Sequence, residues 1–264
     1  MSVHAAAPAL RVTQARVLRS EWTKLWSLRS TTWTLLTAVA LMTGIGAILS
    51  AVSAAQHHSL GASFSPVTAS LAGTSFAVIA FGVLGVLMMS GEYGTGMVRS
   101  TLTVVPRRLP VLWAKLATFA VTTFTASFAA SLASFWIGQA LLAGHHLGVP
   151  ITAPGAFRSV LGAALYITVA GLLGVALGAL LRATAAGVAA FAGAFFVVPP
   201  LAVLLPGSIG THLATYLPSN AGSALWGGTT GAHTLGPWAG FAVLCGYAVV
   251  LIAAAAWRLA NSDA

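Results

Sequence analysis

Acidic residues, and charge of any kind, are scarce in this chain of 264 residues. Only 3 residues are Asp or Glu, and charged residues make up 6% of the sequence, whereas a soluble domain carries about 25%. Hydrophobic residues make up 58%. This composition excludes a soluble globular domain, and because disordered chains are poor in apolar residues it also excludes a disordered one. The single cysteine, Cys245, excludes a disulfide scaffold.

Positive charge exceeds negative charge, with 12 Lys and Arg residues and a formal net charge of +9. A nucleic-acid-binding protein gathers such cations on one solvated face. Here the cations separate long uncharged runs instead. We therefore expect no nucleic acid among the partners of this chain and expect the lipid bilayer to be one of them.

The lengths of the uncharged runs predict membrane-spanning helices, because one helix needs about 20 apolar residues to cross a bilayer. The runs also lack the alternating pattern of a membrane β-barrel. The sequence therefore predicts an all-α polytopic membrane protein with a single transmembrane domain over residues 1–264. Six spans are expected, at about 31–54, 68–90, 112–142, 158–181, 185–205 and 237–257.

The distribution of the cations predicts the orientation of the chain. Six spans place both termini on one side of the membrane, together with the segments that follow the second and fourth spans. That side holds every Lys and Arg except Arg158. Because cytoplasmic loops are enriched in Lys and Arg, we expect a multi-pass protein of the plasma membrane with both termini in the cytoplasm.

Residues 12–28 predict an amphipathic helix that precedes the first span. Leu18, Trp22 and Leu25 share one face, and Trp26 adjoins it. The charged residues lie mostly elsewhere: Arg16, Arg19, Glu21 and Lys24. Such a helix suits the surface of the inner leaflet. A simpler interpretation is a positively charged anchor that only fixes the topology, and the two interpretations are compatible.

Residues 91–110 form the second cytoplasmic segment. Glu92 stands at the expected membrane edge, glycines at 94 and 96 predict a turn, and Pro106-Arg107-Arg108 ends the short apolar run that follows. One interpretation is an ordinary loop whose cations obey the positive-inside rule. The other is a short structured element that docks onto another protein.

Two motifs carry a resemblance to a known family. Residues 19–30, RSEWTKLWSLRS, and residues 92–96, EYGTG, followed by Pro106-Arg107-Arg108 and Lys115, resemble the membrane subunits of type-2 ATP-binding-cassette exporters, of actinobacterial type. The resemblance covers nearly the whole chain, because that family has an N-terminal interfacial helix, six spans and a long outer segment between spans five and six.

This resemblance implies a role for each polar segment. Residues 12–28 would be the connecting helix, residues 92–107 would contain a coupling helix that docks in a groove of the ATPase, and the extracellular segment 206–236 would supply re-entrant helices. The implied docking residues are Glu92, Tyr93, Gly94, Thr95, Arg99, Arg107 and Arg108. The implied residues of the interfacial helix are Glu21, Trp22, Lys24, Trp26 and Arg29.

The resemblance also implies partners. The sequence contains no Gly-Lys pair of the kind that a nucleotide-binding phosphate loop needs. We therefore expect this chain not to be an enzyme and to carry no cofactor, with ATP and Mg bound by a separate ATPase subunit. A second permease copy would complete the export pathway, as a homodimer or a heterodimer.

Three further patterns are less specific. Gly171, Gly174 and Gly178 recur at about one helical turn in the fourth span and predict close helix packing, with a hinge as the alternative. Pro199-Pro200 predicts an end or a kink in the fifth span. The histidine pairs at 57–58 and 145–146 lack neighbouring carboxylates or thiols, so we expect no metal site.

Other functions remain open at the level of the sequence. A stand-alone secondary transporter usually places an ionisable residue near the bilayer midplane, and the sequence predicts none there. An intramembrane enzyme is disfavoured because the chain has no Gly-x-Ser-x-Gly or His-Glu-x-x-His motif. A membrane subunit that senses or anchors without transporting has no distinguishing sequence feature.

Overall fold

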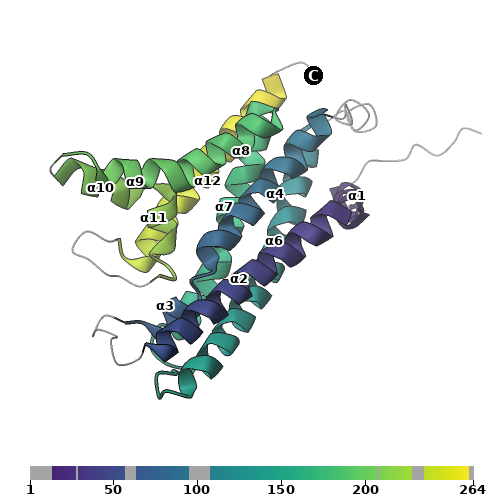
Figure 1. Cartoon of the computed structure of the whole chain (residues 1–264). Helices are drawn as coiled ribbons and strands as arrows, with labels where there is room; N and C mark the ends of the chain where they lie inside the picture. Colours follow the sequence, from purple (N-terminus) through teal and green to yellow (C-terminus); the bar gives the residue numbers. More distant parts are fainter. Residues whose placement is uncertain are drawn as a thin grey trace, which may run out of the picture.

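The structure, a computed structural model, describes residues 14–27, 29–56, 64–94, 108–206, 208–227 and 235–261. Within these residues every regular element is a helix, and six helices are long and apolar enough to cross a membrane. The all-α polytopic fold is therefore confirmed. Figure 1 shows most of the long helices side by side in one tilted bundle, with the short helix α1 at its upper right end, while α9 (Val198–Val203) and α10 (Ser208–Tyr216) extend away from it to the left.

The spanning helices lie close to the predicted spans. They are α2 (Arg29–Ala55), α4 (Thr74–Gly94), α6 (Arg108–Ala143), α7 (Ala156–Leu181), the continuous segment Thr184–Val203, and α12 (Pro237–Asn261). The interfacial helix predicted at 12–28 is α1 (Gln14–Ser27). In the segment 206–236, the described residues form two short helices, α10 (Ser208–Tyr216) and α11 (Pro218–Ser223).

The second predicted span, 68–90, differs from the structure at its start. Residues 66–70 form a separate short helix, α3 (Pro66–Ser70), and α4 begins at Thr74 after a turn. Ser65 caps α3 by accepting a hydrogen bond from the Thr68 amide. At the turn, a Cβ on Gly73 would overlap the backbone of Met42 in α2, so this close approach requires glycine.

The fifth span is a helix with a changed winding in its middle. It consists of α8 (Thr184–Ala192), a π-helical segment η2 (Gly193–Val197) and α9 (Val198–Val203). Pro199 and Pro200 have no amide hydrogen and so cannot bond to the carbonyls one turn earlier, which lie in η2. The π-helical winding stands directly before this proline pair, and the helix does not end there but continues to Val203.

Helix α7 lies at the centre of the bundle, with the largest buried share of any spanning helix among the described residues. Glycines permit its close contact with α4. A Cβ on Gly174 would overlap the carbonyl oxygen of Gly82. A Cβ on Gly178 would lie 2.7 Å from the carbonyl oxygen of Val86. Gly171 meets the ring of Phe119, where a Cβ would lie 2.7 Å from a ring carbon. The three glycines predicted to allow close packing thus lie at the contacts of α7 with α4 and α6.

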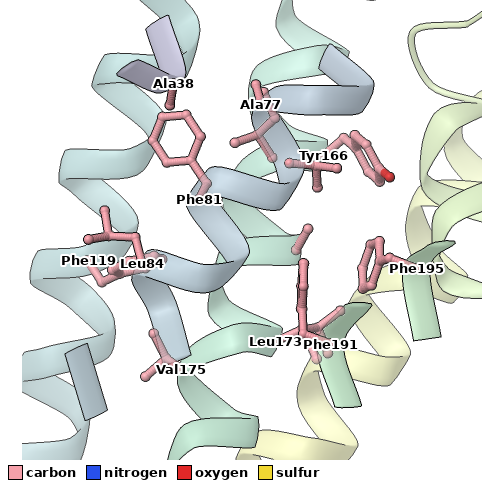
Figure 2. Close-up of a cluster of buried hydrophobic side chains, with 14 of the residues drawn as sticks. Ala38, Ala77, Phe81, Leu84, Phe119, Tyr166, Leu173, Val175, Phe191 and Phe195 are labelled. Carbon is pink, nitrogen blue, oxygen red and sulfur yellow. The ribbon is translucent and has the colours of Figure 1, made fainter. Parts of the chain in front are cut away.

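Aromatic side chains fill the core beside these glycines. Figure 2 shows Phe81 of α4 and Phe119 of α6 near one side of the α4–α7 contact, and Phe191 and Phe195 of the fifth span on the other. The rings of Phe191 and Phe195 are stacked, with centroids 4.5 Å apart. Because lipid chains are as apolar as these side chains, such rings stabilise the contact between membrane helices through close van der Waals packing.

Tryptophans mark both ends of the bundle. The exposed tryptophans near α1 are Trp22, Trp26, Trp33, Trp113 and Trp257, and those near the other end are Trp136 and Trp238. Tryptophan is enriched at the two membrane–water interfaces, where its ring is apolar and its N–H remains hydrated. The two groups therefore agree with a bundle that crosses the bilayer along its length.

Candidate functional site

Four charged side chains meet at the α1 end of the bundle, and we refer to Glu21, Lys24, Glu92 and Lys115 as the charge cluster. The Lys115 ammonium lies 2.7 Å from Glu21 Oε2 and 2.9 Å from Glu92 Oε1. Lys24 lies 2.9 Å from Glu21 Oε1 and 3.5 Å from Glu92 Oε1. Each ammonium therefore contacts both carboxylates, and the formal charges of the cluster sum to zero.

Three helices supply the charge cluster. Glu21 and Lys24 lie on one face of α1, three residues apart, while Glu92 comes from the last turn of α4 and Lys115 from the second turn of α6. Glu21 and Lys115 are each 2% exposed. Buried charges are costly unless they are paired and hydrogen-bonded, so the cluster requires α1, α4 and α6 to stay together.

The buried face of α1 differs from the sequence interpretation, which placed Glu21 mostly away from the apolar face. The buried residues of α1 are Val17, Glu21 and Leu25, one helical turn apart. Trp22 and Trp26 remain exposed on a neighbouring face, with ring centroids 6.0 Å apart. The helix thus presents one face to the bundle and a separate aromatic face, and the buried Lys115 explains why a glutamate occupies the first.

The charge cluster keeps its α1 members ionised. Burial alone would raise the pKa of the Glu21 carboxyl, but the positive charge and hydrogen bond of Lys115, together with Lys24, outweigh burial and lower that pKa below its usual value. Burial alone would lower the pKa of Lys24, but hydrogen bonds and charge from Glu21 and Glu92 raise it. Near neutral pH, Glu21 is therefore a carboxylate and Lys24 an ammonium.

The end of α4 also contacts the junction between α7 and α8. The Arg182 guanidinium lies over the ring of Tyr93, 5.3 Å from its centroid, and the hydroxyls of Ser90 and Thr184 are 2.8 Å apart. Arg182 itself adopts a left-handed conformation that ends α7. Consecutive residues Glu92 and Tyr93 therefore connect α4 to opposite sides of the bundle.

The remaining predicted site residues are placed as follows. Thr95, Arg99 and Arg107 lie outside the described residues. Gly94 is the last residue of α4 and Arg108 the first of α6. Arg29 begins α2 and is exposed. Residues 95–107 of the predicted coupling segment thus have described helices on both sides.

Lys115 is the one member of the charge cluster that the sequence interpretation did not assign to a site. It was noted only among the cations that set the orientation and as part of the family resemblance. A lysine at a helix position otherwise filled by buried residues was the available signal, since such a charge needs a partner. Among the described residues, no group of three or more His, Cys, Asp and Glu side chains has the geometry of a metal site.

Comparison with known proteins does not assign the chain to a family. No protein-family model matches this sequence, and no curated protein matches it significantly.

Proposed function

We propose that this chain is the permease subunit of an ATP-driven ABC exporter, which forms the membrane pathway and couples to a separate ATPase subunit. The observation that carries the proposal is the charge cluster. It joins the interfacial helix α1 to α4 and α6, the two helices that lead into and out of the predicted docking segment. Of the sequence motifs that resemble the exporter family, the described residues Glu21, Lys24, Glu92 and Lys115 lie on these three helices.

The geometry offers a route for mechanical coupling. Glu92 precedes residues 95–107 on α4, and Lys115 follows them on α6, 2.9 Å away. A force applied to the segment between them acts on two spans that are held together at that point. Through Glu21 the same force reaches α1, and through Tyr93 and Arg182 it reaches α7.

In the proposed mechanism, ATP closes the partner ATPase subunits and the 92–107 segment carries this motion into the membrane helices, which open the pathway outward. Such coupling requires the ATPase to contact the two states of the permease differently. ATP and Mg are bound by the partner. A second permease copy, identical or different, completes the pathway.

The proposed orientation places the α1 end in the cytoplasm of a cell whose plasma membrane holds the chain. The described cations gather at this end, including Arg16, Lys24, Lys115, Arg182 and Arg258, while Arg158 lies near the other and contacts the Leu225 carbonyl. This asymmetry is the one that cytoplasmic ends of membrane proteins carry. Both termini would then be cytoplasmic.

A stand-alone secondary transporter is the second candidate, and the positions of the acidic residues argue against it. The chain has 3 acidic residues, of which Glu21 and Glu92 lie in the charge cluster at the α1 end and Asp263 lies outside the described residues. Ion-coupled transport usually relies on an acidic residue within the membrane.

A sensor or anchor subunit would use the same docking surface without a pathway.

The test is to purify the tagged chain in mild detergent from its native cells and to identify bound proteins. The proposal predicts a stoichiometric ATPase and nucleotide hydrolysis by the purified complex. Arg99→Glu, in the predicted docking segment, should release the ATPase because it reverses a charge there. Arg158→Glu, a matched reversal at the opposite end of the bundle, should retain it.

Recovery of the intact chain without any nucleotide-hydrolysing partner would contradict the proposal. A partner that stays bound to both variants would keep the exporter assignment but remove residues 92–107 as the docking site.

A further inference from the structure

A cavity of about 580 Å³ lies beside the charge cluster, between α1, α2, α4 and α6. It falls within the range of about 300–1,000 Å³ that small-molecule sites usually occupy. Residues of the charge cluster form part of its wall. The other lining residues are Leu25, Ser27, Ser30, Thr31, Thr34, Leu84, Leu87, Met88, Gly91 and Phe119.

The cavity has a polar part and an apolar part. The start of α2 contributes the hydroxyls of Ser30, Thr31 and Thr34, and α4 contributes the apolar side chains of Leu84 and Met88. Leu87 and Ser30, both exposed, give the cavity an opening at the surface of the bundle. A ligand that fits must therefore combine a hydrogen-bonding head with an apolar body.

The position of the cavity agrees with this requirement. It lies between α1, whose Trp22 and Trp26 are exposed, and the first turns of α2, where Trp33 is also exposed. Exposed tryptophans of this kind stand at the boundary between the hydrocarbon and the headgroups. A membrane lipid in this leaflet therefore presents its own head-to-chain junction at the depth of the cavity.

The charge cluster selects against a charged head. Its two ammonium groups and two carboxylates already satisfy one another, with Lys24 shared between Glu21 and Glu92. An anionic head would compete with a carboxylate for Lys24, and a cationic head would compete with Lys24 for a carboxylate. A head without any ionised group leaves these pairs intact.

The hydroxyls favour a head that donates hydrogen bonds. Thr34 already donates its own hydrogen to the Ser30 carbonyl, and Ser27 donates to the Lys24 carbonyl, so their oxygens offer lone pairs to a ligand donor. We propose that this cavity binds an uncharged single-chain amphiphile with a hydroxyl-bearing head, of the monoacylglycerol class. This site does not depend on the proposed export function.

The test uses a photoactivatable monoacylglycerol and the full chain in lipid nanodiscs, with crosslinks located by mass spectrometry. Unlabelled competitors share one sixteen-carbon chain and differ in the head: monopalmitoylglycerol, palmitate and hexadecyltrimethylammonium. We expect crosslinks on the lining residues of α2 and α4, and at least tenfold stronger competition by monopalmitoylglycerol than by either charged amphiphile.

Two variants and their matched controls locate the site. Met88→Trp fills the apolar part and should abolish the crosslink, while Ile79→Trp, an exposed position of α4 that does not line the cavity, should not. Thr34→Val removes one hydroxyl and should weaken monoacylglycerol competition about fivefold, the equivalent of one hydrogen bond. Thr43→Val removes the same kind of within-helix hydrogen bond elsewhere on α2 and should have no effect.

Three results would overturn the proposal. Crosslinks spread evenly over lipid-facing residues would show that the cavity holds no particular lipid. Equal competition by palmitate would show that the head is not selected for charge. An unchanged competition curve for Thr34→Val would remove the polar part of the site, and this variant alters too little volume for misfolding to explain its result.

Discussion

The two ends of α6 hold two polar clusters of different chemistry. At one end, Lys115 contacts two carboxylates from α1 and α4. At the other, Ser134 donates to the Ser70 carbonyl at 2.6 Å, and the Gln139 amide donates to the Pro66 carbonyl and the Ser70 hydroxyl at 3.1 and 2.9 Å. Lys115 and Gln139 lie about 36 Å apart along the helix, close to the thickness of a bilayer.

We refer to Ser70, Ser134 and Gln139 as the neutral cluster. Its side chains form hydrogen bonds mainly with backbone groups of other segments. Gln139 also accepts a hydrogen bond from the Val149 amide, so one side chain joins α6, α3 and the segment that leads to α7. None of these groups changes charge near neutral pH. The neutral cluster therefore holds these segments together through uncharged hydrogen bonds, each of which contributes a modest net stability.

In the charge cluster, the contacts join charged side chains to one another: lysine ammonium groups lie against glutamate carboxylates. Removal of one partner leaves a buried charge without compensation, which costs far more than the loss of a neutral hydrogen bond. The comparison therefore shows that, at the α1 end, the loss of a single charged side chain should lower the stability more than the loss of a single hydrogen bond in the neutral cluster. It is also the end from which the predicted docking segment emerges.

Lys115→Met should give the largest loss of stability, about 3–5 kcal/mol, because it leaves the buried Glu21 carboxylate without its closest partner. The measurement is the free energy of unfolding in mixed micelles. Lys24→Met is the matched control. The Lys24 side chain is 33% exposed, so its loss should cost roughly 1 kcal/mol or less. Equal losses for the two lysines would contradict the difference in burial.

Gln139→Leu should cost about 2 kcal/mol in the same assay, since the Val149 amide and the Pro66 carbonyl lose their partner. Ser134→Ala, which removes one hydroxyl from the same cluster, should cost about 1 kcal/mol. A loss for Gln139→Leu as large as that for Lys115→Met would remove the distinction between the two ends.

Acid should weaken only the charge cluster. The pKa of Glu21 is lower in the folded protein than its usual value of 4.5, so the stability it contributes is present above pH 4.5 and is lost as pH falls through the folded pKa. The pH dependence of the Lys24 contribution has the opposite sign. The pKa of Lys24 is raised in the folded protein, so the stability that Lys24 contributes is present below pH 10.5 and is lost as pH rises through the folded pKa.

The effect of Gln139→Leu should therefore stay constant across this acid range, while the difference between wild type and Glu21→Gln should shrink as pH falls below 4.5. Unfolding measured as a function of pH checks both curves. A Glu21→Gln difference that does not change in acid would contradict the ion pairing of Glu21.

Much of the fold was predictable because membrane spans depend on length and apolarity, which a sequence shows directly. The six spans follow from that property, and the interfacial helix follows from the helical spacing of Leu18, Trp22 and Leu25. The turn at Gly73 and the π-helical segment η2 were harder to predict. The first depends on contact with Met42 of α2, and the second depends on how the chain adapts around Pro199.

The charge cluster was only partly predictable. Glu21 and Lys24 were assigned to the interfacial helix and Glu92 to the docking segment, through the family resemblance, but their pairing was not apparent. Lys115 is 94 residues from Glu21 in the sequence, so no helical spacing connects them. Only the packing of α1 against α6 brings the two together, and this packing also turns Glu21 toward the bundle.

The central claim is that the Glu21–Lys115 pair holds the interfacial helix to the bundle, and a double-mutant cycle tests it most directly. The free energy of unfolding is measured for wild type, Glu21→Gln, Lys115→Met and the double variant. We predict that the double variant loses less stability than the sum of the single variants, with a coupling energy of about 1–3 kcal/mol. Additive losses would contradict the claim, because they would show that the two side chains stabilise the fold independently.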